Sequence, residues 1–184
     1  MRPVRVLVGR STACGSRRRR YVRAMRERVR AAQTGDLEAV AAIWSVGWHD
    51  GHDGHTPEEL TRARTEASFR ARAAARLGDT TLAEVDGAVA GFVVVRADEV
   101  EQIYVATEHR GTGLAVRLLR AAADIVAEGG HRRAWLAVAS GNARARRFYE
   151  RAGWIDEGAF DYAAEGPDGP LAVDCHRYSH RVGD

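Results

Sequence analysis

Lysine is absent from this chain of 184 residues, and all 28 of its basic side chains are arginines. Without lysine the chain cannot contain a Walker A loop, which binds phosphate through that residue. Cysteine is also scarce, because Cys14 and Cys175 are the only two and they do not form a CxxC pair. Two cysteines exclude a disulfide framework, so we expect two free thiols in a reducing compartment, the cytoplasm.

Long apolar runs are missing as well. No stretch approaches the 18 apolar residues that a membrane-spanning helix needs, so we expect no membrane partner. The apolar segment 4–8 is too short for a secretory signal and is interrupted by Arg5. What is present, 45% hydrophobic and 29% charged residues, is typical of a globular protein, and the length predicts one domain.

Charge is distributed unevenly along the chain. The first 30 residues hold eleven arginines and one acid, Glu27, whereas the other 154 hold 17 arginines and 24 acids. We expect residues 1–24 to be a basic extension, disordered or not translated, ahead of a domain at 25–184. A targeting peptide and a nucleic-acid-binding arm are the alternatives, although nucleic acid is not the expected partner. The acidic body favours a cationic or amine-bearing acceptor.

Periodicity and turn signals predict the element order β-α-α-β-β-β-α-β-α-β-β. The expected helices begin at residue 37, at about 57 (a run to about 76, broken once), at 112 and at 143. The expected strands cover 29–33, 80–85, 88–96, 99–105, 133–138, 153–160 and 171–178. Asp86-Gly87 is the strongest hairpin signal, and Thr56, Pro57 and Glu59 resemble a helix-capping box.

The segment 109–115 joins a predicted strand directly to a predicted helix. Gly111, Gly113 and Ala115 are small enough to let backbone N–H groups face outward at the helix start, which suits a pyrophosphate. Val116 stands where a dinucleotide-binding GxGxxG motif needs glycine, so that motif is excluded. A simple glycine turn between strand and helix is the alternative.

Two blocks of residues resemble one superfamily. Arg110-x-x-Gly113-x-Ala115 matches the pattern R/Q-x-x-G-x-G/A, and the segment from Asn142 to Trp154 resembles N-x-x-A-x-x-F-Y-x-x-x-G-F/W. Over about residues 29–180 the chain therefore resembles the GNAT (Gcn5-related N-acetyltransferase) superfamily. The resemblance implies an α/β (α+β) fold with a mixed, mostly antiparallel, splayed β-sheet of six to seven strands flanked by about four helices.

The resemblance also implies acetyl-CoA as cosubstrate and no metal. The pantetheine arm would follow the strand at Ile103, Tyr104 and Val105, with Asn142 on the opposite lip. The amide of Ile103 or a near neighbour would stabilise the developing oxyanion. The pyrophosphate would lie against the loop and the helix start, which means Arg110, Gly111, Thr112, Gly113, Leu114 and Ala115.

Acetyl transfer needs a proton donor for the leaving thiolate and a proton acceptor for the amine. Tyr149 stands at the general-acid position of the family, and a buried core aromatic is its alternative role. Glu99 and Glu101 are the candidate bases, on a strand face that we expect them to share with Ile103 and Val105. A water chain in place of a dedicated base, or two acids that bind a cationic amine, are the alternatives.

The glycine- and histidine-rich stretch 47–54 is predicted to be a loop between the first two helices, a region that lines the acceptor pocket in this fold. We expect Trp48, His49 and His52 to contact the acceptor. The spacing of His49, His52 and His55 also allows a zinc site or a solvated loop. A second loop, 163–170, is a candidate cover for the site.

The sequence therefore predicts an acetyl-CoA-dependent N-acetyltransferase that acts on a primary amine of a small molecule or an amino-acid-like acceptor. A protein N-terminal or lysine acetyltransferase is the alternative within the same class. A non-catalytic acyl-CoA-binding sensor module and a nucleic-acid-binding protein are alternatives outside it. Many members of the superfamily are dimers, so the resemblance leaves a homodimer open.

Overall fold

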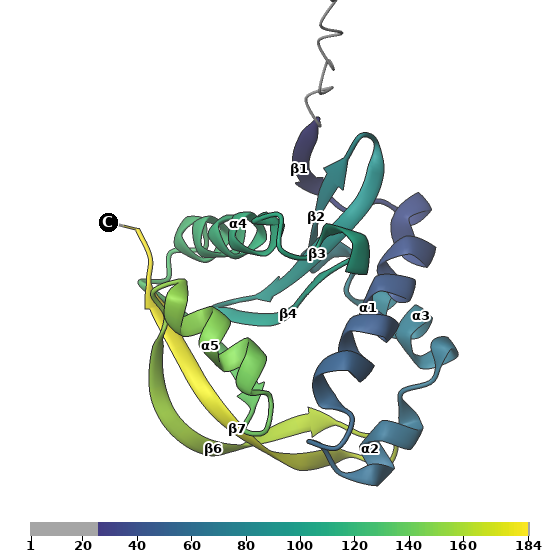
Figure 1. Cartoon of the computed structure of the whole chain (residues 1–184), viewed down its shortest axis with the longest axis vertical. Helices are drawn as coiled ribbons and strands as arrows, with labels where there is room; N and C mark the ends of the chain where they lie inside the picture. The colour runs from purple at the N-terminus through teal and green to yellow at the C-terminus, as the bar shows by residue number, and fades with distance from the viewer. Residues whose placement is uncertain (1–25, 184) are drawn as a thin grey trace, which may run out of the picture.

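The computed structural model of the protein describes residues 26–183 (Figure 1). The expected N-terminal extension, residues 1–24, lies outside the described residues. Within the described range, no helix is long and apolar enough to cross a membrane.

Residues 26–183 form seven strands, five α-helices and three short 3-10 turns. The strands are β1 (Glu27–Ala31), β2 (Thr80–Val85), β3 (Ala88–Arg96), β4 (Glu99–Val105), β5 (Arg133–Ala139), β6 (Ile155–Glu165) and β7 (Pro170–Arg181). The helices are α1 (Leu37–His52), α2 (Glu58–Ala63), α3 (Glu66–Ala75), α4 (Leu114–Glu128) and α5 (Ala143–Arg151). The 3-10 turns are η1 (Thr34–Asp36), η2 (Leu77–Asp79) and η3 (Thr107–His109).

The seven strands form one sheet in the order β1-β2-β3-β4-β5-β7-β6. Neighbouring strands are antiparallel except β4 and β5, which are parallel and pair at a single position, Glu99 with Trp135. Beyond that pair no further residues of the two strands are paired, so the strands separate. The predicted fold class is confirmed, including the splay in the sheet.

Helices cover both faces of the β1–β4 half of the sheet (Figure 1). Helix α4 carries a stripe of buried residues at helical spacing, which packs on one face: Leu114, Leu118, Leu119, Ala122 and Val126. On the other face, Trp44 of α1 and Phe69 of α3 are fully buried against Phe92 of β3. These two cores fix the position of β4 between α4 and α1.

Helix α1 is longer than predicted, because it continues through the glycine- and histidine-rich stretch to His52. The prediction of a loop there is therefore wrong. Two of its glycines allow close packing: a Cβ atom at Gly47 would overlap the ring of Tyr104, and one at Gly51 would lie 3.0 Å from the side-chain nitrogen of Asn142. Packing against the sheet thus outweighs the poor helix propensity of glycine.

The capping box predicted for the next helix is also wrong. Helix α2 begins at Glu58 with Pro57 as its N-cap, and no side chain caps it. The hydroxyl of Thr56 instead donates to the carbonyl oxygen of His52 at 3.3 Å. Helices α2 and α3 are separate, which confirms the predicted break in this run.

Strands β6 and β7 form a long hairpin that includes most of the segment predicted as a loop at 163–170. Ala163 pairs with Ala172, and Glu165 pairs with Pro170. The hairpin signal at Asp86-Gly87 is confirmed, because both residues have positive φ angles (51° and 87°) and join β2 to β3.

Candidate active site

A cavity of about 320 Å³ opens where β4 and β5 separate. Its walls come from these two strands, from α1, α2, α3 and α5, and from the β6–β7 hairpin. Its size lies at the lower end of the range typical of small-molecule sites. Segments far apart in the sequence therefore meet at one place.

The edge of β4 that faces the gap presents free backbone donors. The amide of Ala106 donates to the carbonyl oxygen of Ala90, on the β3 side, at 2.9 Å. Because N–H direction alternates along a strand, the amides of Val105 and Ile103 point the opposite way, toward the gap. This matches the predicted orientation of the Ile103 amide, and such an edge can pair with an extended ligand as another strand would.

A bulge at Glu101 changes which side chains share a face of β4. Val94 pairs with Gln102 but Val95 pairs with Val100, so β4 has one extra residue between the two pairs. The prediction that Glu99 and Glu101 share a face with Ile103 and Val105 is therefore wrong. Ile103 and Val105 pack into the α4 core, whereas the two carboxylates bond to residues of β6 and α3.

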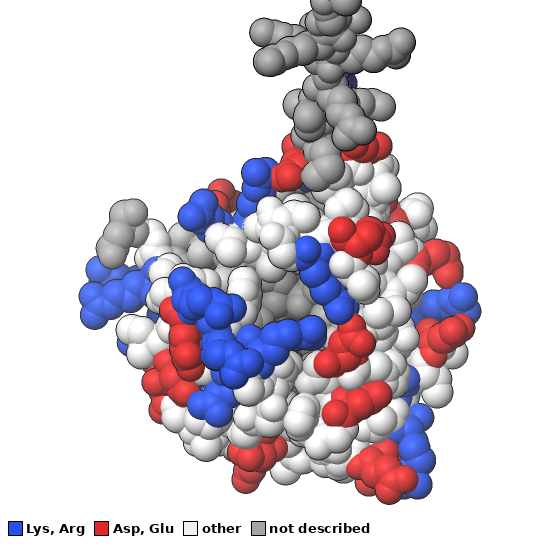
Figure 2. All heavy atoms as spheres, viewed as in Figure 1, with Lys and Arg blue, Asp and Glu red and all other residues white. Residues whose placement is uncertain are grey.

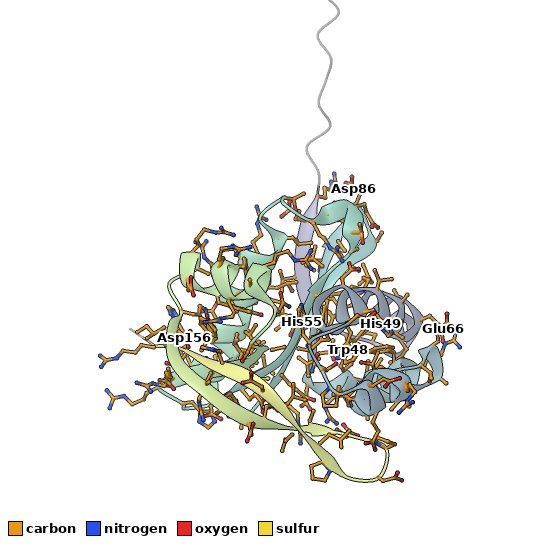
Figure 3. All side chains as sticks on the ribbon, turned by 60° about the horizontal axis from the view of Figure 1, so that its bottom comes forward. Trp48, His49, His55, Glu66, Asp86 and Asp156 are labelled. Atoms are coloured by element: carbon orange, nitrogen blue, oxygen red, sulfur yellow. The ribbon has the colours of Figure 1, made fainter. Side chains whose placement is uncertain are left out.

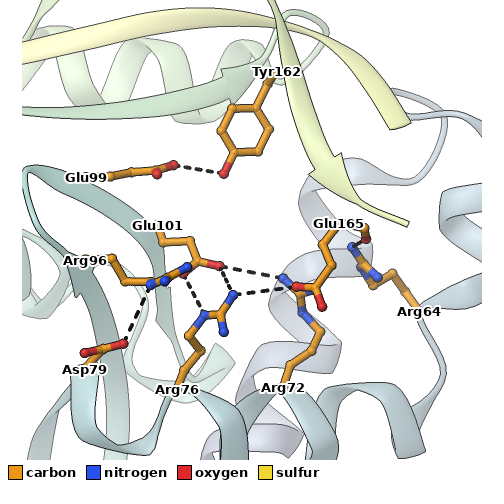
Figure 4. A network of polar contacts seen from close by, with 9 residues as sticks. All are labelled: Arg64, Arg72, Arg76, Asp79, Arg96, Glu99, Glu101, Tyr162 and Glu165. Carbon is orange, nitrogen blue, oxygen red and sulfur yellow. Dashed lines mark hydrogen bonds and ion pairs between the residues drawn. The ribbon is translucent and has the colours of Figure 1, made fainter. Parts of the chain in front are cut away.

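Glu99 is half-buried at the point where β4 and β5 are still paired. The hydroxyl of Tyr162 donates to its carboxylate at 2.9 Å (Figure 4). Burial raises the pKa of Glu99 above its usual range, and the Tyr162 hydrogen bond only partly opposes this effect. A carboxylate with a raised pKa holds a proton better, which suits a general base.

Glu101 has a different environment, because two arginines of the α3 region hold it. Nε of Arg76 donates to one carboxylate oxygen at 2.9 Å, and Nη2 of Arg76 donates to the other at 3.3 Å. Nη2 of Arg72 lies 3.9 Å away, and the Glu101 side chain is only 8% exposed. Both oxygens thus accept hydrogen bonds from Arg76, so this carboxylate already has a structural partner.

Two tyrosine side chains line the cavity, Tyr104 from β4 and Tyr149 from α5. Tyr149 of α5 is 8% exposed and packs against Phe148 and Trp154, with ring centroids 5.1 and 6.1 Å away. Burial raises the pKa of both Tyr149 and Tyr104, and Tyr104 is further raised by its proximity to Tyr149. The Tyr149 side chain lines the cavity. Tyr149 is therefore both a core aromatic and a protonated phenol at the cavity.

The loop before α4 is open to solvent. Gly111 and Gly113 have positive φ angles of 78° and 89°, and a Cβ atom at either would meet nothing within 4 Å. Thr112 closes the loop by donating its hydroxyl to the carbonyl oxygen of His109 at 2.7 Å. The first N–H groups of a helix have no partner within the helix, so this open surface fits an anionic diphosphate.

Arg110, the first residue of the predicted phosphate loop, forms an ion pair with Asp50 of α1 at 2.7 Å. On the face seen in Figure 2, basic side chains gather over α5 beside a central hollow. The exposed arginines of α5 are Arg144, Arg147 and Arg151. This face is suited to a polyanionic ligand.

Asn142 lines the cavity and caps α5, because its Oδ1 atom accepts the amide of Ala145 at 3.0 Å. Its side-chain nitrogen lies beside Gly51 of α1, on the far side of the gap from β4. Asn142 therefore lies on the lip opposite Ile103 and Tyr104, as predicted.

Two of the three predicted acceptor-contacting residues line the cavity: Trp48 and His52. Their rings stack with centroids 4.8 Å apart, and Nδ1 of His52 donates to the Trp48 carbonyl oxygen at 2.9 Å. Because that nitrogen carries the proton, Nε2 has a free lone pair in the neutral ring. Burial lowers the pKa of His52, which favours this neutral form.

His49 does not line the cavity, in contrast to the prediction. Its ring nitrogens lie 3.0 Å from the Asp53 carboxylate and 3.2 Å from the Arg64 carbonyl oxygen. His55 lies beside Gly141 in the β5–α5 turn, so the histidines do not converge (Figure 3). Across the described range, no three side chains of the metal-binding types gather in one place.

Sequence reasoning missed several polar residues of the cavity, among them Arg64, Arg72, Arg76, Arg96, Tyr162 and Glu165. Four-residue spacing puts Arg72 and Arg76 on one side of the chain at α3, but Arg62 and Arg70 interrupt any clear pattern. Tyr162 and Glu165 reach the site only because β6 is longer than its predicted end at residue 160.

Comparisons with known proteins agree with this geometry. The model of the acetyltransferase (GNAT) family matches residues 37–154, more than half of the chain. Uncharacterized N-acetyltransferases of Mycobacterium tuberculosis and Mycobacterium bovis are 34% identical over 74 residues. That match covers 38% of this chain, and the chain spans about half (47%) of the length of these relatives.

Solved structures share the fold at low sequence identity. A GCN5-related N-acetyltransferase from Rhodopseudomonas palustris superposes with a TM-score of 0.66 at 20% identity, covering 84% of this chain and 95% of that one. The yncA protein of Salmonella typhimurium, solved with its cofactor acetyl-CoA, gives 0.63 at 19% identity, covering 86% and 95%. The PaiA N-acetyltransferase of Thermoplasma acidophilum, solved with coenzyme A, gives 0.58 at 19% identity, covering 86% and 100%.

Proposed function

Because the chain belongs to the acetyltransferase (GNAT) family, we propose that it transfers an acetyl group from acetyl-CoA to a primary amine of a small or amino-acid-like acceptor. The main structural support for this proposal is the gap between β4 and β5, which opens into a cavity of about 320 Å³. Residues of the β6–β7 hairpin and of the α1–α3 segment also line this cavity, and its small volume favours a small acceptor over a protein chain. We also propose that residues 25–184 form the catalytic domain and that the reaction takes place in the cytoplasm.

The cosubstrate would supply the activated acetyl group, and the chain would bind it at two places. Backbone amides from Gly111 to Ala115, together with Arg110, would hold the diphosphate at the start of α4. The free edge of β4 at Ile103, Tyr104 and Val105 would hydrogen-bond the extended pantetheine arm, with Asn142 on the other lip.

The acceptor amine must lose a proton to attack a carbonyl carbon, because only its neutral form has a free lone pair. Glu99 is the proposed base, since burial raises its pKa and its carboxylate lines the cavity. The neutral His52 ring presents Nε2 as a hydrogen-bond acceptor to the same amine. Trp48 supports His52 by stacking and through its carbonyl oxygen.

Two groups would stabilise the charges that develop during transfer. The amide of Ile103 points into the gap and can donate to the acyl oxygen as negative charge builds on it. The Tyr149 phenol stays protonated because burial raises its pKa, so it can donate its proton to the departing thiolate sulfur.

Gly113→Val should weaken coenzyme A binding at least tenfold, because the side chain both strains a position at φ 89° and covers the amides at the start of α4. Isothermal titration calorimetry measures this affinity. Gly130→Val is the matched control: Gly130 follows the other end of α4, also has a positive φ (83°) and also has open space around it. Equal affinity in wild type and Gly113→Val would contradict the proposed diphosphate site.

Tyr149→Phe should lower kcat about 100-fold, a typical contribution of a general acid, with little change in the Kd of acetyl-CoA. Release of free thiol in the presence of an amine panel measures the rate. Tyr178→Phe is the control, because its ring lies 5.8 Å from Tyr149 while its hydroxyl donates to Glu150 instead. Retention of the full rate in Tyr149→Phe would remove its role as acid.

Glu99→Gln should abolish the rise of the rate with pH on the acid side of the profile. The base must be deprotonated, so the wild-type rate increases as pH passes upward through the raised pKa of Glu99. Glu101→Gln should retain this rise of the rate with pH, because Arg76 already donates hydrogen bonds to both carboxylate oxygens of Glu101. If the rate of Glu99→Gln still rises with pH in this range, a water molecule or the substrate itself supplies the base.

A further inference from the structure

The cavity has a small excess of positive charge, although the body of the chain is acidic. Four arginines line it against three glutamates, Glu99, Glu101 and Glu165. The arginines come from the α2–α3 region and from the end of β3 (Figure 4): Arg64, Arg72, Arg76 and Arg96.

Most of these arginines have an acidic partner. Arg76 binds Glu101 through two hydrogen bonds, and Arg96 lies 3.8 Å from Asp79 outside the cavity. Nη1 of Arg72 donates to the Glu165 carboxylate at 2.8 Å, and Nη2 of Arg76 lies 3.6 Å from the same carboxylate. The positive charge of the cavity is therefore only partly neutralised.

Among the four cavity arginines, Arg64 is the one that has no acidic partner within the described residues. It is 8% exposed, and its Nη2 donates to the backbone carbonyl oxygen of Glu165 at 2.5 Å. Between residues 26 and 183, no carboxylate forms an ion pair with it. Burial and the nearby Arg72 lower the pKa of Arg64 to about 10. Buried charges in proteins are normally paired, so a buried guanidinium that lines a cavity and forms no ion pair is suited to bind an anion.

Arg72 is a second cavity arginine whose hydrogen-bond donors are not all used. Its Nε is buried without a hydrogen-bond partner among the described residues, and its guanidinium lies 5.2 Å from the centre of the Trp44 ring. Its acidic partner, Glu165, lies at the turn of the β6–β7 hairpin with a side chain that is 63% exposed. The Arg72 side of this pair is largely buried (13% exposed) whereas the Glu165 side is open to solvent, so the Glu165 carboxylate can turn toward solvent when another anion takes its place.

We propose that Arg64 and Arg72 bind a carboxylate of the acceptor, so that the substrate is a small amino acid or a similar molecule with both an amine and a carboxylate. Guanidinium groups suit this ligand because their planar donors match the two oxygens of a carboxylate. This inference rests on the proposed acetyl transfer and narrows its acceptor from a small amine to one that also has a carboxylate. Such an acceptor remains within the cationic or amine-bearing class that the overall charge favours.

The arrangement orients such an acceptor in the cavity. Glu99 and its partner Tyr162 lie at the β4–β5 junction, where the amine must meet the acetyl group. Arg64 and Arg72 lie on the α2–α3 side of the same cavity. A carboxylate bound there directs the amine toward β4.

Binding of reaction products tests the inference without requiring turnover. The full chain, saturated with coenzyme A, is titrated by calorimetry with N-acetyl-leucine and with N-(3-methylbutyl)acetamide, which lacks only the carboxylate. The corresponding pairs derived from methionine and phenylalanine cover larger side chains. We expect the carboxylate member of at least one pair to bind ten times or more tightly than its partner.

Three variants assign the effect to named residues. Arg64→Gln should abolish the preference for the carboxylate, whereas the exposed Arg62→Gln should keep it. Glu165→Gln should tighten carboxylate binding severalfold, because it removes the acid that competes for Arg72 and Arg76. If Arg64→Gln does not fold, the Glu165→Gln result decides, and an unchanged affinity there overturns the inference.

The outcomes separate the two levels of the account. The proposed carboxylate site is excluded if coenzyme A binds but neither member of any pair is preferred. It is also excluded if Arg64→Gln keeps the preference. In both cases the proposed acetyl transfer stands. If coenzyme A itself does not bind, the proposed function fails and the inference fails with it.

Discussion

The separation of β4 from β5 after a single pair, Glu99 with Trp135, is the constraint on which the rest of the site depends. Elsewhere in the sheet each strand is paired along much of its length, and unpaired backbone groups in a protein interior are costly. Here the amides of Ile103 and Val105 face an open gap. The gap also admits side chains from both halves of the sheet into one cavity.

Packing of α1 against the sheet makes that arrangement rigid. Gly47 contacts the Tyr104 ring on β4, and Gly51 contacts Asn142 at the start of α5. One helix thus touches both sides of the gap and places Trp48 and His52 in the cavity between them. Because two cores hold β4 from opposite faces, binding of an extended ligand requires little rearrangement of this strand.

The polar side chains of the site have different charged and hydrogen-bonding neighbours, which gives them different roles. Glu99 and Glu101 are two residues apart in the sequence, yet one accepts a tyrosine hydroxyl and the other accepts two hydrogen bonds from Arg76. This difference supports Glu99 as the base and Glu101 as a structural counter-ion. Arg64, buried without a carboxylate partner in the described part of the chain, adds a positive charge that the acceptor can neutralise.

Local signals were sufficient to predict most of the fold and part of the site. The order of the strands, the Asp86-Gly87 turn, the apolar stripe of α4 and the glycine loop before it all depend on residues close together in the sequence. The errors arose where distant segments meet. The continuation of α1 through Gly47 depends on the Tyr104 ring, and the orientation of Glu99 depends on a bulge at Glu101 that strand periodicity does not reveal.

The length of the β6–β7 hairpin also could not be predicted from local sequence signals. Alternation of small and polar residues after residue 160 is too weak to distinguish a strand from a loop, and the pairing of Ala163 with Ala172 becomes evident only in the folded chain. Tyr162 and Glu165 were missed for that reason. The cavity arginines were missed because many other arginines surround them in the sequence.

A crystal structure of the full chain with coenzyme A tests the central claim most directly. The account predicts the pantetheine arm in the gap between β4 and β5, hydrogen-bonded to the free edge of β4, with the diphosphate at Gly111–Ala115. Coenzyme A bound outside the gap, or a β4 edge that pairs with β5 instead of the ligand, would contradict it.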